Sequence, residues 1–266
     1  MSYKSLRYRT NHRINDRLAR LACRTCYFAV LLVLPGLHVS FLAGCGQSEN
    51  ISDRLYPYYI NEQTFSGQGI VYVYQPVSNP ELPAEYWHYR VIHDWRGNML
   101  KSALYDPAGM LTQESVERLE SDQAELMSLE LMYAIDTGTV TIVPKINERG
   151  TFPFGLIDES PATTFQIEYW DTSEDSVRVI LTKQRSLVER LEYPFEGRSV
   201  PAVRVAVTET LETETQGFTE TTWSGTEIYA QDIGLVYYKK EINDQFILEY
   251  SLADRLTFEQ FRGRLE

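Results

Sequence analysis

Apolar and polar residues alternate with a period of two along most of the chain beyond residue 67. The alternation is clearest in Tyr86–Trp95, Thr164–Tyr169, Val177–Thr182 and Val203–Thr208. Successive side chains of a strand point to opposite faces, so this period indicates strands with one apolar face. The pattern predicts a mainly β domain.

Short turn sequences separate the alternating segments, for example Arg96–Asn98, Asp106–Gly109 and Asp136–Gly138. Sequential strands joined by short turns predict an antiparallel meander. We expect this meander to form a curved sheet or an open half-barrel with one or two short helices. Residues 111–125 fit either a helix or a strand, and the charged tail 253–266 fits a short terminal helix.

Charge is distributed unevenly between the two ends of the chain. The first 45 residues carry a net charge of +6 and the remaining 221 carry −18, within a total of −12. A basic head on an acidic body indicates that the head has a separate role. The acidic body argues against a nucleic-acid partner, whose binding surface would be basic.

The basic head has the organisation of an export signal. After Arg24 comes an apolar stretch of 16 residues, Tyr27–Leu42, which is followed by small residues and a cysteine. A basic region, a short apolar region and small residues before a cleavage site form a secretory signal. The stretch is shorter than the roughly 20 residues that a membrane-spanning helix needs.

The end of this signal resembles the lipobox of bacterial outer-membrane lipoproteins. The matching residues are Leu42, Ala43, Gly44 and Cys45. The resemblance implies that signal peptidase recognises the first three and cleaves before Cys45. It also implies a diacylglyceryl thioether on Cys45 and a further acyl chain, such as palmitate, on its amine. Two or three acyl chains anchor a protein stably to a membrane.

The residue after the cysteine bears on location. In enteric lipoproteins an Asp at that position retains the protein in the inner membrane, so Gly46 implies the outer membrane, facing the periplasm or the cell surface. The alternative is an uncleaved signal anchor. We therefore divide the chain into a signal peptide (1–44), a lipidated tether (45–66) and a single β-rich domain (67–266).

The C-terminal part of the domain is similar to uncharacterised envelope lipoproteins and to the curved sheets of lipoprotein carriers. The similarity spans about residues 194–252, with Asp232 and Ile233 departing from the usual glycine and valine. It implies a curved sheet around an apolar groove and no catalytic residues. The segments that carry it are Trp223, Glu227–Val236, Tyr237–Glu241 and Leu248–Tyr250.

No strong catalytic or metal-binding motif is present. Cys45 is the only cysteine after the leader, which excludes thiol catalysis and internal disulfides in the mature chain. His88 and His93 are an odd number of residues apart, so a strand would point them to opposite faces. We found no Gly-x-Ser-x-Gly, His-Glu-x-x-His or phosphate-binding loop motif. We therefore expect no catalytic residue, metal or cofactor.

Three functional hypotheses follow. The first is a non-catalytic binding or structural module, anchored to the membrane through Cys45, with a lipid or an envelope protein as partner. The second is a carrier or sensor of an apolar, lipid-like molecule, bound in a groove of the curved sheet. The aromatic strand face predicts that groove, and its residues are Trp87, Tyr89, Val91 and Trp95.

The third hypothesis is an acid-based hydrolase. Two carboxylates that flank a sugar can hydrolyse a glycosidic bond, and Glu209 and Glu220 are the best pair in the acidic ribbon. Acids on an alternating strand more commonly form a solvated edge that prevents aggregation. We expect this role for the ribbon carboxylates Glu209, Glu212, Glu214 and Glu220.

Overall fold

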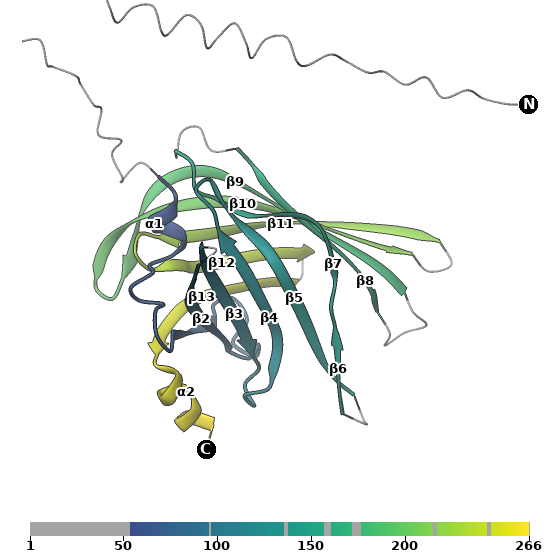
Figure 1. Cartoon of the computed structure of the whole chain (residues 1–266), viewed down its shortest axis with the longest axis horizontal. Coiled ribbons are helices and arrows are strands. Elements are labelled where there is room, and N and C mark those ends of the chain that lie inside the picture. Colours follow the sequence, from purple (N-terminus) through teal and green to yellow (C-terminus); the bar gives the residue numbers. More distant parts are fainter. Residues whose placement is uncertain are drawn as a thin grey trace, which may run out of the picture. The chain divides into compact units, whose positions relative to one another are not determined.

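A computed structural model describes residues 54–265 except 96, 136–137, 157–160, 172–176, 215–216 and 244–245 (Figure 1). The lipobox and Cys45 lie outside the described residues. The prediction of a mainly β fold is confirmed, and the described residues include two short helices where one or two were expected. The helices are α1 (Tyr56–Tyr59) and α2 (Phe258–Leu265). The strands are β1 (Ile70–Pro76), β2 (Glu85–Asp94), β3 (Gly97–Tyr105), β4 (Leu111–Leu119), β5 (Gln123–Ile135), β6 (Gly138–Ile142), β7 (Lys145–Pro153), β8 (Thr163–Asp171), β9 (Val177–Phe195), β10 (Arg198–Glu214), β11 (Phe218–Ala230), β12 (Gly234–Asn243) and β13 (Phe246–Leu256).

The sheet closes on itself, so the expected open half-barrel is wrong. The strand order is β4-β3-β2-β1-β13-β12-β11-β10-β9-β8-β7-β5-β6, and β4 also pairs with β5. This pairing joins twelve antiparallel strands into a ring, to which β6 is added as a hairpin on β5. The closing ladder runs from Gln113 opposite Leu131 to Leu119 opposite Ala124.

The sequence did not identify β4 as a strand, because the side chains of β4 that face the interior are polar. The segment 111–125, which fitted either a helix or a strand, forms β4 and the start of β5. Gln113, Ser115 and Glu117 of β4 face the interior of the ring. Hydrophobic alternation is therefore lost in the strand that converts an open sheet into a barrel.

The segment around α1 plugs one end of the ring. Leu55, Tyr58, Ile60 and Phe65 are each at most 5% exposed. Tyr59 stacks on Phe152 with ring centroids 4.6 Å apart. Residues 54–66, assigned to the tether from the sequence, therefore contribute to the barrel core.

The turn between β11 and β12 holds this plug in place. The backbone N–H of Asp232 donates to the Pro57 carbonyl at 2.8 Å, and the Asn61 amide donates to the Asp232 carbonyl at 3.3 Å. Asp232 has a φ of 62°, a left-handed conformation that Asp tolerates better than most residues. Asp at the usual glycine position is therefore compatible with the turn.

Helix α2 covers the outer face of β1 and β13. Phe261 is 1% exposed and packs against Val71, Val73 and Leu256. Thr257 and Gln260 exchange side-chain hydrogen bonds with each other's backbone N–H at 3.1 and 2.8 Å, a capping box that fixes the start of the helix. Neither helix in the described part of the chain has the length and apolarity required to cross a membrane.

The described residues from Arg54 onward form one compact unit. This unit has its own core and a closed hydrogen-bonded ring, which is what an independently folding domain requires. We therefore expect a soluble fragment of residues 46–266 to fold alone. That fragment contains no cysteine.

Ring closure predicts a specific cross-link. Glu114 and Glu130 face each other across the β4–β5 ladder and are half-buried. Facing residues of antiparallel strands lie close enough for a disulfide. We expect the double variant Glu114→Cys/Glu130→Cys of the fragment to form an intramolecular disulfide on mild oxidation, measured by mass spectrometry.

The matched control is Glu114→Cys with Glu148→Cys on β7. That strand is two positions away from β4 in the ring, beyond the reach of a disulfide. Free thiols in both double variants would show that β4 lies at an open edge.

Candidate functional site

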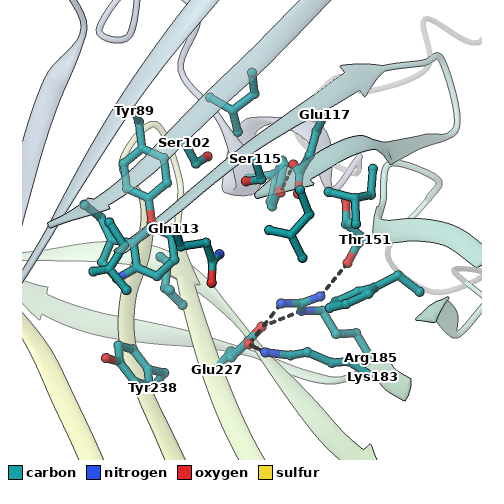
Figure 2. Close-up of a pocket in the computed structure, with 18 of the residues that line it drawn as sticks. Tyr89, Ser102, Gln113, Ser115, Glu117, Thr151, Lys183, Arg185, Glu227 and Tyr238 are labelled. Atoms are coloured by element: carbon teal, nitrogen blue, oxygen red, sulfur yellow. Dashed lines mark hydrogen bonds and ion pairs between the residues drawn. The ribbon is translucent and has the colours of Figure 1, made fainter. Parts of the chain in front are cut away.

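The ring encloses a cavity of about 480 Å³ (Figure 2). Its lining side chains come from every strand of the ring except β13, together with Tyr59 and Phe65 of the plug segment. Eight strands enclose an interior that side chains can just fill, and barrel diameter grows with strand number. A ring of twelve strands is therefore wide enough to leave free volume.

Strands β5, β8 and β9 form an apolar wall. A register shift between Val116 and Glu117 lets Leu126 and Leu129 both face inward, although they are an odd number of residues apart. This wall thus presents a continuous apolar surface to the cavity. Its residues are Leu126, Leu129, Leu131, Phe165, Ile167 and Leu181.

Aromatic side chains of β2 and β12 line another part of the cavity. Trp87 Nε1 and the Tyr238 hydroxyl both donate to Oε2 of Glu85, at 3.0 and 2.5 Å. Trp87 also stacks on Tyr89, with ring planes 10° apart. Burial, followed by the charge of Glu85, raises the pKa of Tyr238 far above its usual value, so this phenol stays protonated as a hydrogen-bond donor.

The four residues of the predicted groove occupy three different environments. Trp87 and Tyr89 line the cavity. Val91 is 3% exposed and belongs to the core at the plugged end of the ring. Trp95 follows the end of β2 and is 83% exposed. The structure therefore brings two of the four together at the cavity.

A network of ion pairs crosses the cavity wall formed by β9–β12. Lys183 Nζ lies 3.0 Å from Glu209 Oε1 and 2.8 Å from Glu227 Oε1. Arg185 donates from Nε to Glu227 Oε2 at 2.7 Å and from a terminal nitrogen to the Thr151 carbonyl at 2.9 Å (Figure 2). Each of these charged groups therefore has a partner of opposite charge.

Lys240 extends this network toward the β11–β12 hairpin. Its ammonium group contacts the second carboxylate oxygen of Glu209 and lies 4.3 Å from the centre of the Trp223 ring. Such a cation–π contact adds stabilisation to the ion pair.

Electrostatics keep the buried network ionised. Burial alone would raise the pKa of Glu227, but Arg185 and Lys183 lower it well below its usual range. Burial would likewise lower the pKa of Arg185, but the charge of Glu227 raises it above its usual value. Both groups therefore carry charge in the folded protein, and each depends on the other.

The pKa of Glu117 is shifted in the opposite direction to the pKa values of Glu209 and Glu227. Glu117 is buried, and it accepts a hydrogen bond from the Tyr59 hydroxyl. Burial raises its pKa above the usual value, although the bond from Tyr59 and the charge of Arg185 act in the opposite direction. Ionisation of this carboxylate is therefore disfavoured in the folded chain.

Sequence analysis missed the charged network because it expected the acids of the ribbon to be solvated. Glu209 instead lies inside the cavity, and so does Glu227, which the sequence analysis named only within the segment Glu227–Val236 and gave no site role. The signal that was available is the spacing of Val203, Val205 and Val207, which puts Glu209 on the same inward strand face.

The two carboxylates considered for hydrolysis do not converge. Glu209 faces the cavity, whereas Glu220 lies opposite Glu212 in the β10–β11 ladder and lines an outer surface depression. This geometry removes the pair on which the hydrolase hypothesis depended.

The histidines take part in local contacts. His88 Nε2 lies 2.7 Å from the Gln68 carbonyl, and its ring stacks on Phe258 with centroids 4.6 Å apart. His93 is exposed and its Nδ1 lies 2.8 Å from the Asn98 side-chain oxygen. Within the described ranges, no group of three or more His, Cys, Asp or Glu residues is arranged to hold a metal ion.

Comparisons with known proteins identify no family. No protein-family model matches the chain, and no curated protein matches it either.

Solved structures of low similarity do match. One is described as a candidate lipoprotein from Parabacteroides distasonis, with 12% identity, a TM-score of 0.47, and coverage of 73% of this chain and 95% of that one. Another is a candidate exported protein with a YmcC-like fold from Bacteroides fragilis, with 13% identity, a TM-score of 0.44 and the same coverage. The hypothetical lipoprotein YmcC from Escherichia coli has 10% identity, a TM-score of 0.34, and coverage of 71% and 87%. Because these TM-scores are all below 0.5, we infer no site, ligand or activity from the similarity.

The buried ion pair predicts a large stability effect. Arg185→Met keeps most of the side-chain volume but leaves Glu227 without its bidentate partner. Lys183 still lies 2.8 Å from Glu227, so the carboxylate keeps one cation. Because a hydrogen bond to a charged group contributes about 1.5–3 kcal/mol, we expect a loss of about 2–3 kcal/mol in the free energy of unfolding measured in urea. The matched control is Arg204→Met, whose partner Glu189 is exposed, and for which the loss should be under about 1 kcal/mol. Similar small losses in both variants would contradict the account of the network.

Replacing Glu117 should stabilise the protein, by an amount that depends on pH. Its pKa is raised on folding, so its contribution to stability is present below the unfolded pKa and is lost as pH rises through the folded pKa. Glu117→Gln keeps an acceptor for Tyr59 but cannot ionise. The variant should therefore have a higher Tm than the wild-type fragment at pH 8, and the two Tm values should converge toward pH 4. A variant that is less stable than wild type at pH 8 would show that the ionised carboxylate stabilises the fold.

Proposed function

We propose that this protein is a non-catalytic, lipid-anchored binding protein of the cell envelope, whose barrel holds an amphipathic small molecule. The observation that carries the proposal is the cavity of about 480 Å³ with its continuous apolar wall. Ligand sites are typically concave, mostly apolar and supplied with a few well-placed polar groups.

The size of the cavity supports a ligand larger than a few water molecules. Its volume falls within the roughly 300–1,000 Å³ range of small-molecule sites and is about three times that of an engineered 150 Å³ cavity that binds benzene. Leucine side chains offer water no hydrogen bonds, so an apolar molecule would occupy this part of the cavity more favourably than water.

The exposure of the lining residues indicates where such a molecule would enter. Near the plug the lining is buried, as at Tyr72 and Tyr229. Leu131 and Tyr169, which lie toward the strand ends away from the plug, are only half-buried. We call this end the mouth, and it gives a ligand access to the cavity without opening the ring.

The lipid anchor is the second part of the proposal. It is supported by the lipobox Leu42-Ala43-Gly44-Cys45 and the basic, apolar leader before it. Gly46 supports the outer membrane as the location, facing either the periplasm or the cell surface. A lipid from that membrane or an envelope protein would then be the natural partner.

The proposal of a non-catalytic role is supported by the pairing of the charged groups. Glu209 and Glu227 are both held by Lys183, and Arg185 and Lys240 add further partners. A general acid or base must be free to exchange its proton with a substrate, whereas these carboxylates are committed to ion pairs.

A cavity-filling variant tests ligand binding. We expect the fragment of residues 46–266, purified from a bacterial periplasm, to retain a small-molecule adduct of lipid-like mass in native mass spectrometry. Leu129→Trp would occupy the apolar wall and should abolish the adduct. Met127→Trp is the matched control, because Met127 is 38% exposed on the same strand, and it should keep the adduct.

A wild-type fragment without any adduct, which also fails to bind lipid-like molecules added to it, would reject the ligand-binding role. An adduct that persists in Leu129→Trp would place the ligand outside the cavity.

The anchor is tested separately. Full-length protein should incorporate labelled palmitate and fractionate with membranes, and Cys45→Ala should abolish both, because only the thiol forms the lipid thioether. Cys23→Ala is the control, since that cysteine lies in the cleaved leader, and it should leave labelling unchanged. Labelling that survives Cys45→Ala would contradict the lipobox assignment.

A further inference from the structure

We propose that the molecule in the cavity has an uncharged headgroup bearing hydroxyl or amide groups, which binds Ser102, Ser115 and Gln113. This inference rests on the proposed function, because it names the class of ligand that the same cavity takes.

The three polar side chains form one cluster on β3 and β4. Ser102 and Ser115 face each other across the β3–β4 ladder, and Gln113 precedes Ser115 by two residues on the same inward face. Figure 2 shows all three side chains at the cavity. We refer to them as the polar cluster.

The polar cluster has unused hydrogen-bonding capacity. Ser102 and Ser115 are only 6% and 7% exposed. None of the three side chains hydrogen-bonds to another residue in the part of the chain that the structure describes. The hydroxyl oxygens of Ser102 and Ser115 are not among the fully buried atoms without a partner, so they are accessible from the cavity. Polar groups inside a protein normally have a hydrogen-bond partner, because leaving one unsatisfied is costly. A group that enters the cavity can provide that partner.

The rest of the cavity argues against an ionised headgroup. The cations Lys183, Arg185 and Lys240 are already paired with Glu209 and Glu227. An anionic headgroup would lose its hydration on entry and find no free cation among the described residues. A cationic headgroup would have to compete for Glu85 with the hydrogen bonds that this carboxylate accepts from Trp87 and Tyr238. An uncharged hydroxyl or amide group avoids this penalty and matches the donors and acceptors of the polar cluster.

The position of the polar cluster beside the apolar wall indicates a second property of the ligand, an apolar body. Ser115 lies directly opposite Leu129, and Gln113 lies opposite Leu131, in the β4–β5 ladder. The polar cluster therefore borders the apolar wall along its length. A molecule with its headgroup at the cluster can lay an acyl or similar chain along these leucines toward the mouth.

The test compares three probes that share one oleyl chain: monoolein, oleic acid and oleylamine. Binding to the fragment is measured below the aggregation concentration of each probe, by tryptophan fluorescence and native mass spectrometry. We expect monoolein to bind most tightly. The double variant Ser102→Ala/Ser115→Ala should raise its Kd roughly tenfold, the effect of losing about two hydrogen bonds, and leave the Kd of oleic acid unchanged.

Two further variants make the test specific. Ser128→Ala removes an exposed hydroxyl from the outer face of β5 and should leave all three affinities unchanged. Gln113→Leu keeps the cavity filled to a similar extent and should weaken monoolein alone. Circular dichroism spectra that match the wild type would show that each variant is folded.

The remaining outcomes would contradict the inference, and they distinguish its failure from failure of the proposed function. Equal binding of the three probes, without effect of the double variant, would leave ligand binding intact and reject the headgroup assignment. If oleic acid bound most tightly, the cavity would recognise an anionic headgroup. If oleylamine bound most tightly and Glu85→Gln abolished this binding, the cavity would recognise a cationic headgroup. Failure of all three probes, in a fragment that also carries no native adduct, would reject both the inference and the proposed function.

Discussion

The hydrogen-bonded pairing of β4 with β5 determines the character of the whole domain. Without it, the same strands would form a curved sheet with two exposed edges, which proteins must protect against aggregation. With it, twelve strands form a ring that is too wide for its inward side chains to fill completely. The cavity of about 480 Å³ is therefore a consequence of closure, and the plug around α1 leaves access from the mouth.

Closure also explains why charged residues occur inside the domain. A carboxylate that faces the interior needs a cation or hydrogen-bond donors beside it to remain ionised. Lys183 and Arg185 of β9 meet Glu209 of β10 and Glu227 of β11 across neighbouring strands, so the inward charges neutralise one another. The neutral groups on the opposite side, Ser102 and Ser115, have no such partners among the described residues and are left to face the cavity.

The sequence predicts those parts of the fold in which alternation is hydrophobic. The strands around Tyr86–Trp95 and Val203–Thr208 are correctly identified because their inward residues are apolar or aromatic. Strand β4 is ambiguous because its inward residues are polar, and ring closure depends on a pairing between strands that no local pattern encodes. Glu209 continues the inward face of β10, yet its buried position can be recognised only when Lys183 is known to lie beside it. At the end of β2, by contrast, Trp95 leaves the strand and is exposed, although the alternation placed it with Trp87.

The central claim is that β4 and β5 close the ring, and hydrogen exchange of the fragment tests it most directly. Residue-resolved exchange measured by NMR reports how strongly each backbone amide is protected in the native state. The account predicts that the amides of β4 that point toward β5 are protected as strongly as those that point toward β3, to a degree similar to the central pair β9 and β10. Rapid exchange at every second amide of β4, with strong protection of the others, would show that β4 is an edge strand and that the barrel is open.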